Sequence, residues 1–318
     1  MKNILLLGGT GFVGSHVCEK LVRQGWHVTV PTRRLSNARQ LLPLPLVTVL
    51  VLDVHDEAAL LRAVAGHDAV VNLVAILHGT QAAFEKVHVA LLHKLARACI
   101  AAHIKQLVHI SALGADALHP QSAPSMYLRS KGQGEAVLMQ TAGIGAAAAF
   151  DLTILRPSVI FGAEDKFLNL FARLQTVFPL MPLARADARF QPVWVQDVAA
   201  AVVRSLERDG TVSVANAPRV VEACGPDVFT LKELVQLAAQ LSGIRKGRGR
   251  PVISLPLWLG RLQARLMELA PGEPLMSRDN LDSMQRDNVA SGSLPGLQSL
   301  GIAPAALRPI AAEYLKRK

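Results

Sequence analysis

The feature that most constrains the fold is a glycine-rich turn near the start of the chain. A short apolar run at residues 2–7 leads into Gly-Gly-Thr-Gly-Phe-Val-Gly at positions 8–14, and a helical pattern follows over residues 12–24. Gly8, Gly11 and Gly14 form GxxGxxG in this strand–turn–helix context. Glycines permit positive φ and let the backbone approach a pyrophosphate, which the amides of the helix N-terminus then face. The turn predicts a dinucleotide site, and a glycine connector without a ligand is the alternative.

The next 150 residues alternate strand and helix patterns. Strands are predicted at residues 26–30, 46–52, 69–74, 106–110 and 152–155, and helices at residues 57–65, 81–102 and 125–139. Such alternation predicts an α/β protein of the Rossmann type, with a doubly wound parallel sheet whose ligands lie beyond the carboxyl ends of the strands. After about Ser158 the regularity fades, with helices predicted at residues 198–206 and 231–241. We expect an NAD(P)-binding domain over residues 1–158. A smaller, mostly helical substrate region over residues 159–318 should have segments interleaved into it.

Composition narrows the class of protein. The chain is 51% hydrophobic and 18% charged, which suits a packed core rather than disorder. Cys18, Cys99 and Cys224 are far apart and form no CxxC, so a reducing compartment without disulfides or a metal site is expected. No run of 18 apolar residues occurs, which favours a cytoplasmic protein with, at most, contact at the inner face of a membrane. The net charge of +10 suits an anionic cofactor or lipid, and no nucleic-acid motif accompanies it.

The end of the second predicted strand favours one nucleotide. In NAD-preferring sites an acidic residue there binds the ribose 2′-hydroxyl group. Here the strand ends Val-Pro-Thr-Arg-Arg, with Arg33 and Arg34 where the acid would stand. A guanidinium group pairs with a phosphate in bidentate fashion, so the pair favours NADP(H) over NAD(H), while two solvated loop arginines are the alternative.

Three residues form a candidate catalytic site. Tyr127 and Lys131 have the spacing YxxxK on the helix predicted after the fifth strand, so they share one helix face. A lysine cation should lower the pKa of the tyrosine toward a useful range for proton transfer, and could also hold the nicotinamide ribose. Ser111 ends the fifth strand, where its hydroxyl group could polarise a substrate carbonyl. The alternative is a surface tyrosine beside an exposed lysine.

These residues together resemble a known family. The chain carries in order GGTGFVG (8–14), Arg33-Arg34, Leu52-Asp53-Val54, Asn72-Leu73-Val74-Ala75, Ser111, Tyr127 with Lys131, and RPSVIFG (156–162). This order resembles the extended or atypical branch of the short-chain dehydrogenase/reductase superfamily. The segments VVNLVAILHG (70–79), HISALGA (109–115), YLRSKGQGE (127–135) and FQPVWVQDVA (190–199) are similar to the family of the nucleotide-binding accessory subunit of respiratory complex I, alpha-subcomplex subunit nine, and its bacterial homologues. The similarity covers roughly residues 1–200.

The resemblance implies a set of cofactor contacts. It implies backbone contacts from Thr10, Gly11, Phe12 and Val13, adenine contacts from Asp53 and Val54, inner-edge contacts from Leu73, Val74 and Ala75, and a place for Pro157 near the nicotinamide. It also implies that the dinucleotide can be structural, as in the respiratory relatives, rather than turned over.

Two departures from the family pattern affect the catalytic site. His88 stands where extended members usually carry the asparagine that organises the active site, and Leu91-Leu92 replaces their Gly-Thr. Ser111 precedes Tyr127 by 16 residues, which is closer than in typical extended enzymes. We expect His88 to be a helix residue with a hydrogen-bonding or solvent role rather than a substituted catalytic group.

A basic run and an amphipathic pattern lie in the second half. Arg245, Lys246, Arg248 and Arg250 precede a pattern of large apolar residues on one helical face: Trp258, Leu259, Leu262, Leu266 and Leu269. The combination could bind an anionic membrane or a partner. An ordinary core-facing helix beside a solvated loop is the preferred interpretation.

Three functions follow from these patterns. The first is an NADP(H)-dependent oxidoreductase acting on an unknown carbonyl or quinone-related substrate through Tyr127, Lys131 and Ser111. The second is a non-catalytic, dinucleotide-binding accessory or assembly subunit of a respiratory or quinone-biosynthesis complex. The third is a nucleotide-sugar epimerase or dehydratase, for which the second half carries no recognisable nucleotide-diphosphate motif.

Overall fold

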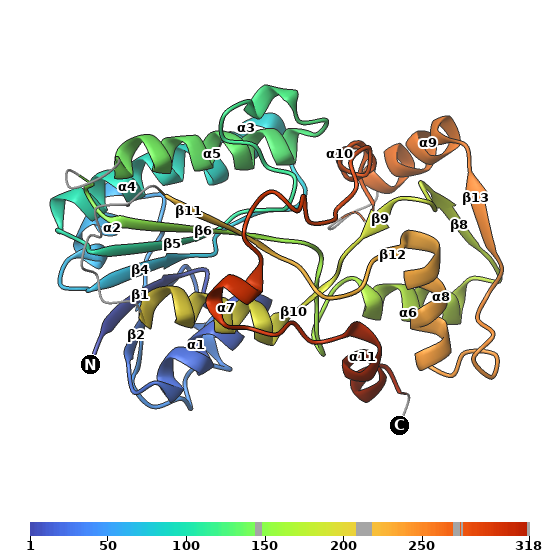
Figure 1. Ribbon diagram of the computed structural model, residues 1–318, viewed down its shortest axis with the longest axis horizontal. Coiled ribbons are helices and arrows are strands. Elements are labelled where there is room, and N and C mark those ends of the chain that lie inside the picture. The colour runs from blue at the N-terminus through green and yellow to red at the C-terminus, as the bar shows by residue number, and fades with distance from the viewer. Residues whose placement is uncertain (144–147, 208–217, 270–273, 275, 317–318) are drawn as a thin grey trace.

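A seven-stranded parallel sheet forms the centre of the molecule (Figure 1). The computed structural model describes residues 1–143, 148–207, 218–269, 274 and 276–316. The sheet order is β11-β6-β5-β4-β1-β2-β3. Its strands are β1 (Asn3–Leu7), β2 (His27–Thr32), β3 (Val47–Val51), β4 (Ala69–Asn72), β5 (Gln106–Ile110), β6 (Asp151–Pro157) and β11 (Arg219–Ala223). The order reverses at β1, which lies between β2 and β4, so the glycine turn after β1 stands at the switch point where such sheets bind ligands. The predicted Rossmann-type fold is confirmed.

Helices cover both faces of this sheet. One face is covered by α1 (Phe12–Arg23) and α7 (Val195–Glu207), and the other by α2 (Glu57–Val64), α4 (Leu91–Ala101) and α5 (Met126–Ala142) (Figure 1). The strands are apolar on both sides because successive side chains alternate between two cores. In β1, Ile4 and Leu6 pack toward α1, while Leu5 and Leu7 pack toward α2 and α4.

The helix predicted at residues 81–102 differs in detail. It consists of α3 (Gln81–Phe84), a π-helical segment (Glu85–Ala90) and α4, so it is helical throughout but is wider in the middle. The π segment brings the backbone of His88 against α5. A Cβ atom on Gly134 would lie 2.2 Å from the carbonyl oxygen of His88. Glycine at this position therefore allows the two helices to meet at backbone distance.

The second half of the chain adds a group of smaller elements beside the sheet and also completes the sheet. Its helices are α6 (Leu168–Val177), α8 (Leu231–Leu241), α9 (Leu257–Glu268), α10 (Arg278–Ser283) and α11 (Leu307–Leu315). Three small strand pairs accompany them. Two are parallel, namely β7 (Ile160–Phe161) with β10 (Val193–Trp194) and β8 (Met181–Ala184) with β13 (Val252–Leu255). The third, β9 (Arg189–Phe190) with β12 (Phe229–Thr230), is antiparallel. Short 3-10 turns lie at Leu35–Ala38, Pro120–Ser122 and Leu297–Leu300. Strand β11 and helix α7 return to the main sheet.

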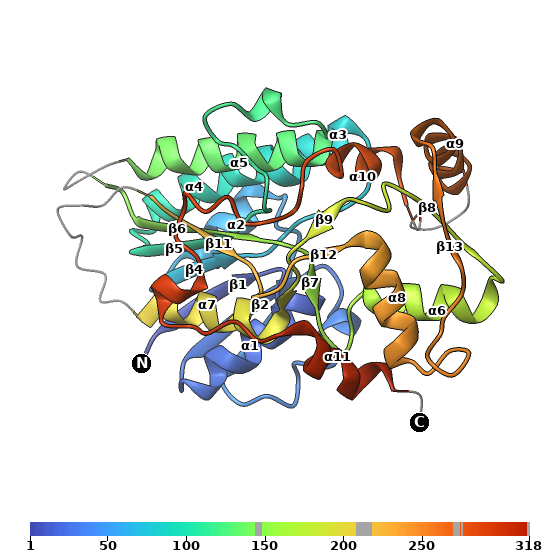
Figure 2. The same cartoon turned by 45° about the vertical axis from the view of Figure 1, so that its right-hand side comes forward.

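The expectation of a core-facing helix near residue 260 is wrong. Helix α9 forms, but Trp258, Leu262, Leu266 and Leu269 are exposed, and its buried residues are Gly260 and Ala264. Figures 1 and 2 show α9 at the end of the molecule farthest from the N-terminus, with β8, β13 and α6. Within the described ranges, no helix combines the length and the apolar character that crossing a bilayer requires.

Candidate dinucleotide and catalytic site

The glycine turn has the geometry of a phosphate-binding loop. Gly8 adopts a φ of +80°, and its carbonyl oxygen accepts a hydrogen bond from the Gly11 amide at 3.1 Å. Gly11 is the N-cap of α1 and has no side chain with which to cap it. The amides of the first helical turn therefore remain available to an anion, which the helix dipole also favours.

Close packing demands glycine at two positions of this turn. A Cβ atom on Gly14 would lie 2.2 Å from the carbonyl oxygen of Gly8, so α1 could not approach β1 with any other residue there. A Cβ atom on Gly8 would lie 3.0 Å from the carbonyl carbon of Leu73. The turn and the segment after β4 thus touch backbone to backbone. These residues fit a dinucleotide, because its pyrophosphate needs this kind of uncovered backbone.

The other predicted cofactor residues lie at the same edge of the sheet. Leu73, Val74 and Ala75 follow β4, and the amide of Val74 donates to the Asn72 side chain at 3.2 Å. Arg33 and Arg34 follow β2 and are exposed, as is Asp53, which follows β3. Val54 is half-buried, and Pro157 ends β6. The carboxyl ends of neighbouring parallel strands bring these residues to one edge.

The structure brings Ser111 and Lys131 together. The Lys131 ammonium group donates to the carbonyl oxygen of Ile110 at 2.8 Å, directly beside Ser111. Ser111 is 4% exposed, and its hydroxyl oxygen has no hydrogen-bond partner within the described part of the chain. Buried hydroxyl groups are rarely left unsatisfied, so this one has unused hydrogen-bonding capacity at the ligand edge of the sheet.

The expected lowering of the pKa of Tyr127 is not found. Burial, followed by the nearby Asp279 carboxylate, raises the pKa of Tyr127 to about 12. Burial also lowers the pKa of Lys131 to about 8, against the opposing effect of Glu135. The lysine cation is itself destabilised by burial, and the acidic neighbour favours the neutral phenol.

Asp279 is a residue of this site that sequence reasoning missed. One of its carboxylate oxygens accepts from the amide of Met126 at 2.6 Å, and the other accepts from the amide of Tyr127 at 3.1 Å. The Ser125 hydroxyl oxygen accepts from the amide of Leu128 at 3.2 Å. The first three amides of α5 therefore have side-chain acceptors, as helix N-termini require. The sequence around residue 279 indicates a capped helix but does not show what that helix packs against.

His88 connects the segment after β4 to α5. Its Nε2 accepts from the amide of Ile76 at 3.1 Å, and its Nδ1 lies 2.8 Å from the hydroxyl oxygen of Ser130, which donates to the Tyr127 carbonyl. The first contact requires an unprotonated Nε2, so Nδ1 carries the proton and donates to Ser130. The His88 ring also packs edge-on against Tyr127, with centroids 5.6 Å apart. The hydrogen-bonding role expected for His88 is confirmed.

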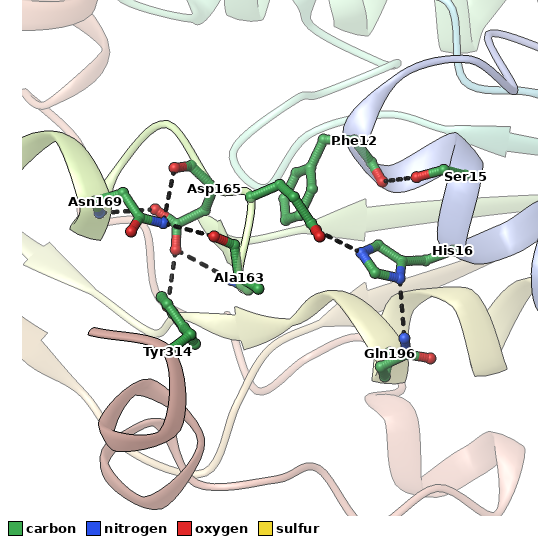
Figure 3. Close-up of polar contacts among 10 residues, drawn as sticks. Phe12, Ser15, His16, Ala163, Asp165, Asn169, Gln196 and Tyr314 are labelled. Carbon is green, nitrogen blue, oxygen red and sulfur yellow. Dashed lines mark hydrogen bonds and ion pairs between the residues drawn. The ribbon is translucent and has the colours of Figure 1, made fainter. Parts of the chain in front are cut away.

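A second polar cluster lies beside the start of α1, and the sequence did not reveal it (Figure 3). The His16 ring lies 3.1 Å from the Glu164 carboxylate and 2.9 Å from the Gln196 side-chain amide. Asp165 accepts from the Tyr314 hydroxyl group at 2.8 Å and from the amide of Gly162 at 3.1 Å. The loop after β7 is thus held between α1 and α11.

Comparison with known proteins agrees with this geometry. The family described as NAD(P)H-binding matches residues 8–209. The NADH dehydrogenase [ubiquinone] 1 alpha subcomplex subunit 9 of Mus musculus is 30% identical, over 98% of this chain and 79% of the mouse protein. A ceramide reductase of Caulobacter vibrioides is 26% identical over 76% of this chain and 71% of its own.

A solved structure shares the fold. The dTDP-glucose 4,6-dehydratase of Streptomyces venezuelae, determined with NAD and TYD bound, superposes with a TM-score of 0.74. The match covers 98% of this chain and 95% of the dehydratase at 19% identity, so the likeness concerns the fold alone.

Proposed function

The chain belongs to the NAD(P)H-binding family and to the family of the alpha subcomplex subunit 9 of NADH dehydrogenase, and on this premise we propose that it is an NADP(H)-dependent oxidoreductase. The observation that carries the proposal is the turn at Gly8–Gly14, whose backbone packing excludes any side chain at Gly14. The turn would hold the pyrophosphate, and the segments after β2, β3 and β4 would hold the adenosine end.

The arginine pair supports the preference for NADP(H). Arg33 and Arg34 are exposed at the end of β2, next to the place of the adenosine ribose in this fold. Burial lowers the pKa of the nearby His55 ring, and the charges of Lys86, Lys94 and Arg33 add to this lowering against the opposing effect of Asp53. Several positive charges at this corner would stabilise a 2′-phosphate, which NAD(H) lacks.

The three catalytic candidates support carbonyl reduction. The bound nicotinamide would supply a hydride to the carbonyl carbon of the substrate. The Ser111 hydroxyl group would donate a hydrogen bond to the carbonyl oxygen. Tyr127 would give its phenolic proton to that oxygen as the hydride is transferred. Its raised pKa keeps the phenol protonated at neutral pH before this step. The Lys131 cation would stabilise the phenolate that remains.

A second candidate function is supported by a different observation. The mouse relative is a subunit of NADH dehydrogenase and matches this chain over 98% of its length. In this alternative the dinucleotide is held as a structural group in a respiratory or quinone-biosynthesis complex, and neither Tyr127 nor Ser111 transfers a proton. The nucleotide-sugar alternative is supported only by the shared fold.

Titration of the purified protein with NADPH and NADH, followed by nicotinamide fluorescence, tests the proposal. The double substitution Arg33→Ala/Arg34→Ala should weaken NADPH binding by at least about 100-fold, because hydrogen bonds to charged groups are worth about 1.5–3 kcal/mol each and two guanidinium groups are removed. It should leave NADH binding nearly unchanged. Lys105→Ala, at the opposite edge of the sheet, is the control. Equal losses for both nucleotides would contradict the NADP(H) preference.

Turnover separates the two functions. NADPH oxidation is measured with a short-chain ubiquinone analogue and with a ketone precursor of ceramide. Tyr127→Phe should keep the affinity for NADPH and reduce any oxidation by at least about 100-fold. If the wild-type protein binds NADPH tightly but oxidises it with neither acceptor, and Tyr127→Phe retains the cellular role, the structural alternative is favoured.

A further inference from the structure

Helix α9 packs on the protein through its smallest residues. Gly260 and Ala264 are its buried positions. A Cβ atom on Gly260 would lie 2.2 Å from the Cβ atom of Ala184 in β8. The helix therefore lies directly against β8 and cannot rotate to bury a larger side chain there. Its orientation fixes which residues face away from the protein.

The large apolar residues of α9 face outward. Trp258 is 67% exposed, Leu262 51%, Leu266 62% and Leu269 77%. Their spacing places them along one side of the helix. Exposed apolar side chains continue this surface onto Ile253 of β13 and Leu257. A soluble monomer seldom gathers so many large apolar groups at one place, so the surface indicates a binding site.

A second exposed apolar group lies at the same end of the molecule. The group consists of Val177, which ends α6, and of Phe178 and Leu180, which lie between α6 and β8. Strand β8 in turn pairs with β13. Figures 1 and 2 both place the end of α6, β13 and α9 at the end remote from the N-terminus. We call α9, β13 and residues 177–180 the distal surface.

The sequence of this region is strongly basic. Residues 234–267 contain six basic residues and no aspartate or glutamate, namely Arg245, Lys246, Arg248, Arg250, Arg261 and Arg265. Arg245, Lys246 and Arg248 are exposed in the loop between α8 and β13, and Arg261 and Arg265 are exposed on α9 itself. Two acidic residues offset part of this charge. Asp282 accepts from Arg261 at 2.9 Å, and Glu268, the last residue of α9, accepts from Arg278 at 2.8 Å.

We propose that the distal surface docks on an anionic membrane, with α9 lying in the plane of the lipid headgroups. A tryptophan, several leucines and flanking arginines on one short helix are the elements of an interfacial helix. The leucines would enter the acyl boundary while the arginines meet the lipid phosphates, each worth about 1 kcal/mol near the surface. The basic excess complements anionic lipid, whereas an apolar protein partner would need no such charge.

Docking is independent of the proposed cofactor chemistry. The residues of the distal surface are not those of the glycine turn or of the Ser111–Lys131 site. Binding to membrane and binding to NADPH can therefore fail separately, and each can be measured on the same sample.

Co-sedimentation of the full chain with vesicles tests the proposal. Vesicles of phosphatidylcholine alone are compared with vesicles that also contain phosphatidylglycerol, at low and high salt. The protein should bind the anionic vesicles and be released by salt. Leu262→Ser/Leu266→Ser should weaken binding at least about tenfold, since each leucine loses most of its transfer free energy. Leu42→Ser/Leu61→Ser removes two exposed leucines elsewhere and should change nothing.

Three results would overturn the proposal. The first is no binding to anionic vesicles at low salt. The second is equal, salt-insensitive binding to both kinds of vesicle, which would remove the role of the basic residues. The third is a lipid-independent dimer that Leu262→Ser/Leu266→Ser disperses, which would assign the surface to a second copy of the chain. An unchanged affinity of Leu262→Ser/Leu266→Ser for NADPH shows that the fold and the cofactor site of this variant are intact.

Discussion

The glycine turn and the start of α5 show two ways of building a site. The turn is made from seven consecutive residues, and its key contacts join Gly8, Gly11 and Gly14 to one another. The start of α5 depends on residues far away in sequence, since Asp279 accepts from the amides of Met126 and Tyr127. A site made of consecutive residues can be recognised from the amino-acid sequence alone. The chemical character of a site assembled from distant residues depends on the tertiary fold.

The difference between the two regions is clearest in Tyr127. Its spacing to Lys131 is a local property, and both residues do lie on α5. Its pKa is instead set by burial and by Asp279, which lies on a helix more than 150 residues away. The same motif can therefore hold its proton more or less tightly, depending on what packs on it.

The largest effect is expected for a substitution in the glycine turn, the site made of consecutive residues. Gly14→Ala places a Cβ atom against the Gly8 carbonyl, which cannot move without displacing β1. We expect the free energy of unfolding, measured in urea, to fall by at least about 3 kcal/mol. Gly11→Ala is the matched control, because its Cβ atom would lie 3.4 Å from the Gly8 oxygen. That variant should lose NADPH affinity but about 1 kcal/mol or less of stability, and equal losses from the two variants would contradict the packing argument.

An intermediate effect is expected at the start of α5, which depends on a residue far away in sequence. Asp279→Ala leaves the amides of Met126 and Tyr127 without their acceptors, so the free energy of unfolding should fall by about 2 kcal/mol. Loss of the carboxylate should also lower the pKa of Tyr127. This pKa is measured by phenolate absorbance in a Tyr314→Phe background, in which Tyr127 is the single tyrosine. Asp282→Ala, on the same helix, should change neither the stability by more than about 1 kcal/mol nor this pKa. An unshifted pKa in Asp279→Ala would show that burial alone sets it.

The smallest effect is a pH dependence that sharpens the comparison. Burial, together with the Lys131 cation, lowers the pKa of His88 from 6.5 to about 3. As the pH falls, His88 binds a proton in the unfolded chain before it does so in the folded protein. Its contribution to stability is therefore complete above pH 6.5 and is lost as the pH falls toward 3. His88→Asn should flatten the fall in stability between pH 6.5 and 5 by about 1 kcal/mol relative to wild type. His93→Asn, an exposed position on α4, should leave the curve unchanged, and identical curves for wild type and His88→Asn would contradict the assignment.

Most of the fold could be predicted, for reasons visible in particular segments. Residues 231–241 form the predicted helix, because the segment is long enough for its apolar residues to show the helical period. Residues 106–110 form the predicted strand, a short segment that is buried throughout. The two-residue strands β7, β9, β10 and β12 are too short to show one. Helix α9 forms where the apolar pattern indicated a helix, but its apolar side faces outward, because Gly260 packs on β8 and no local pattern encodes that contact.

The candidate site was predicted in part. The turn residues and the approach of Lys131 to the end of β5 follow from strand order and helix spacing. The pairing of His88 with Ile76 and Ser130, and the carboxylate of Asp279 on α5, required the packed structure. The preference for NADP(H) and the catalytic roles stay predictions that the binding and turnover measurements address.

The carboxylate of Asp279 also has a consequence for synthesis of the chain. Residues 126 and 127 leave the ribosome 153 and 152 residues before their acceptor. At translation rates of roughly 5–20 residues per second, the nascent helix waits on the order of 10–30 s for its cap. Until then water must satisfy the amides of the first turn of α5. A polypeptide truncated ahead of this aspartate can complete the glycine turn, yet it presents quality-control proteases with an unfinished helix end.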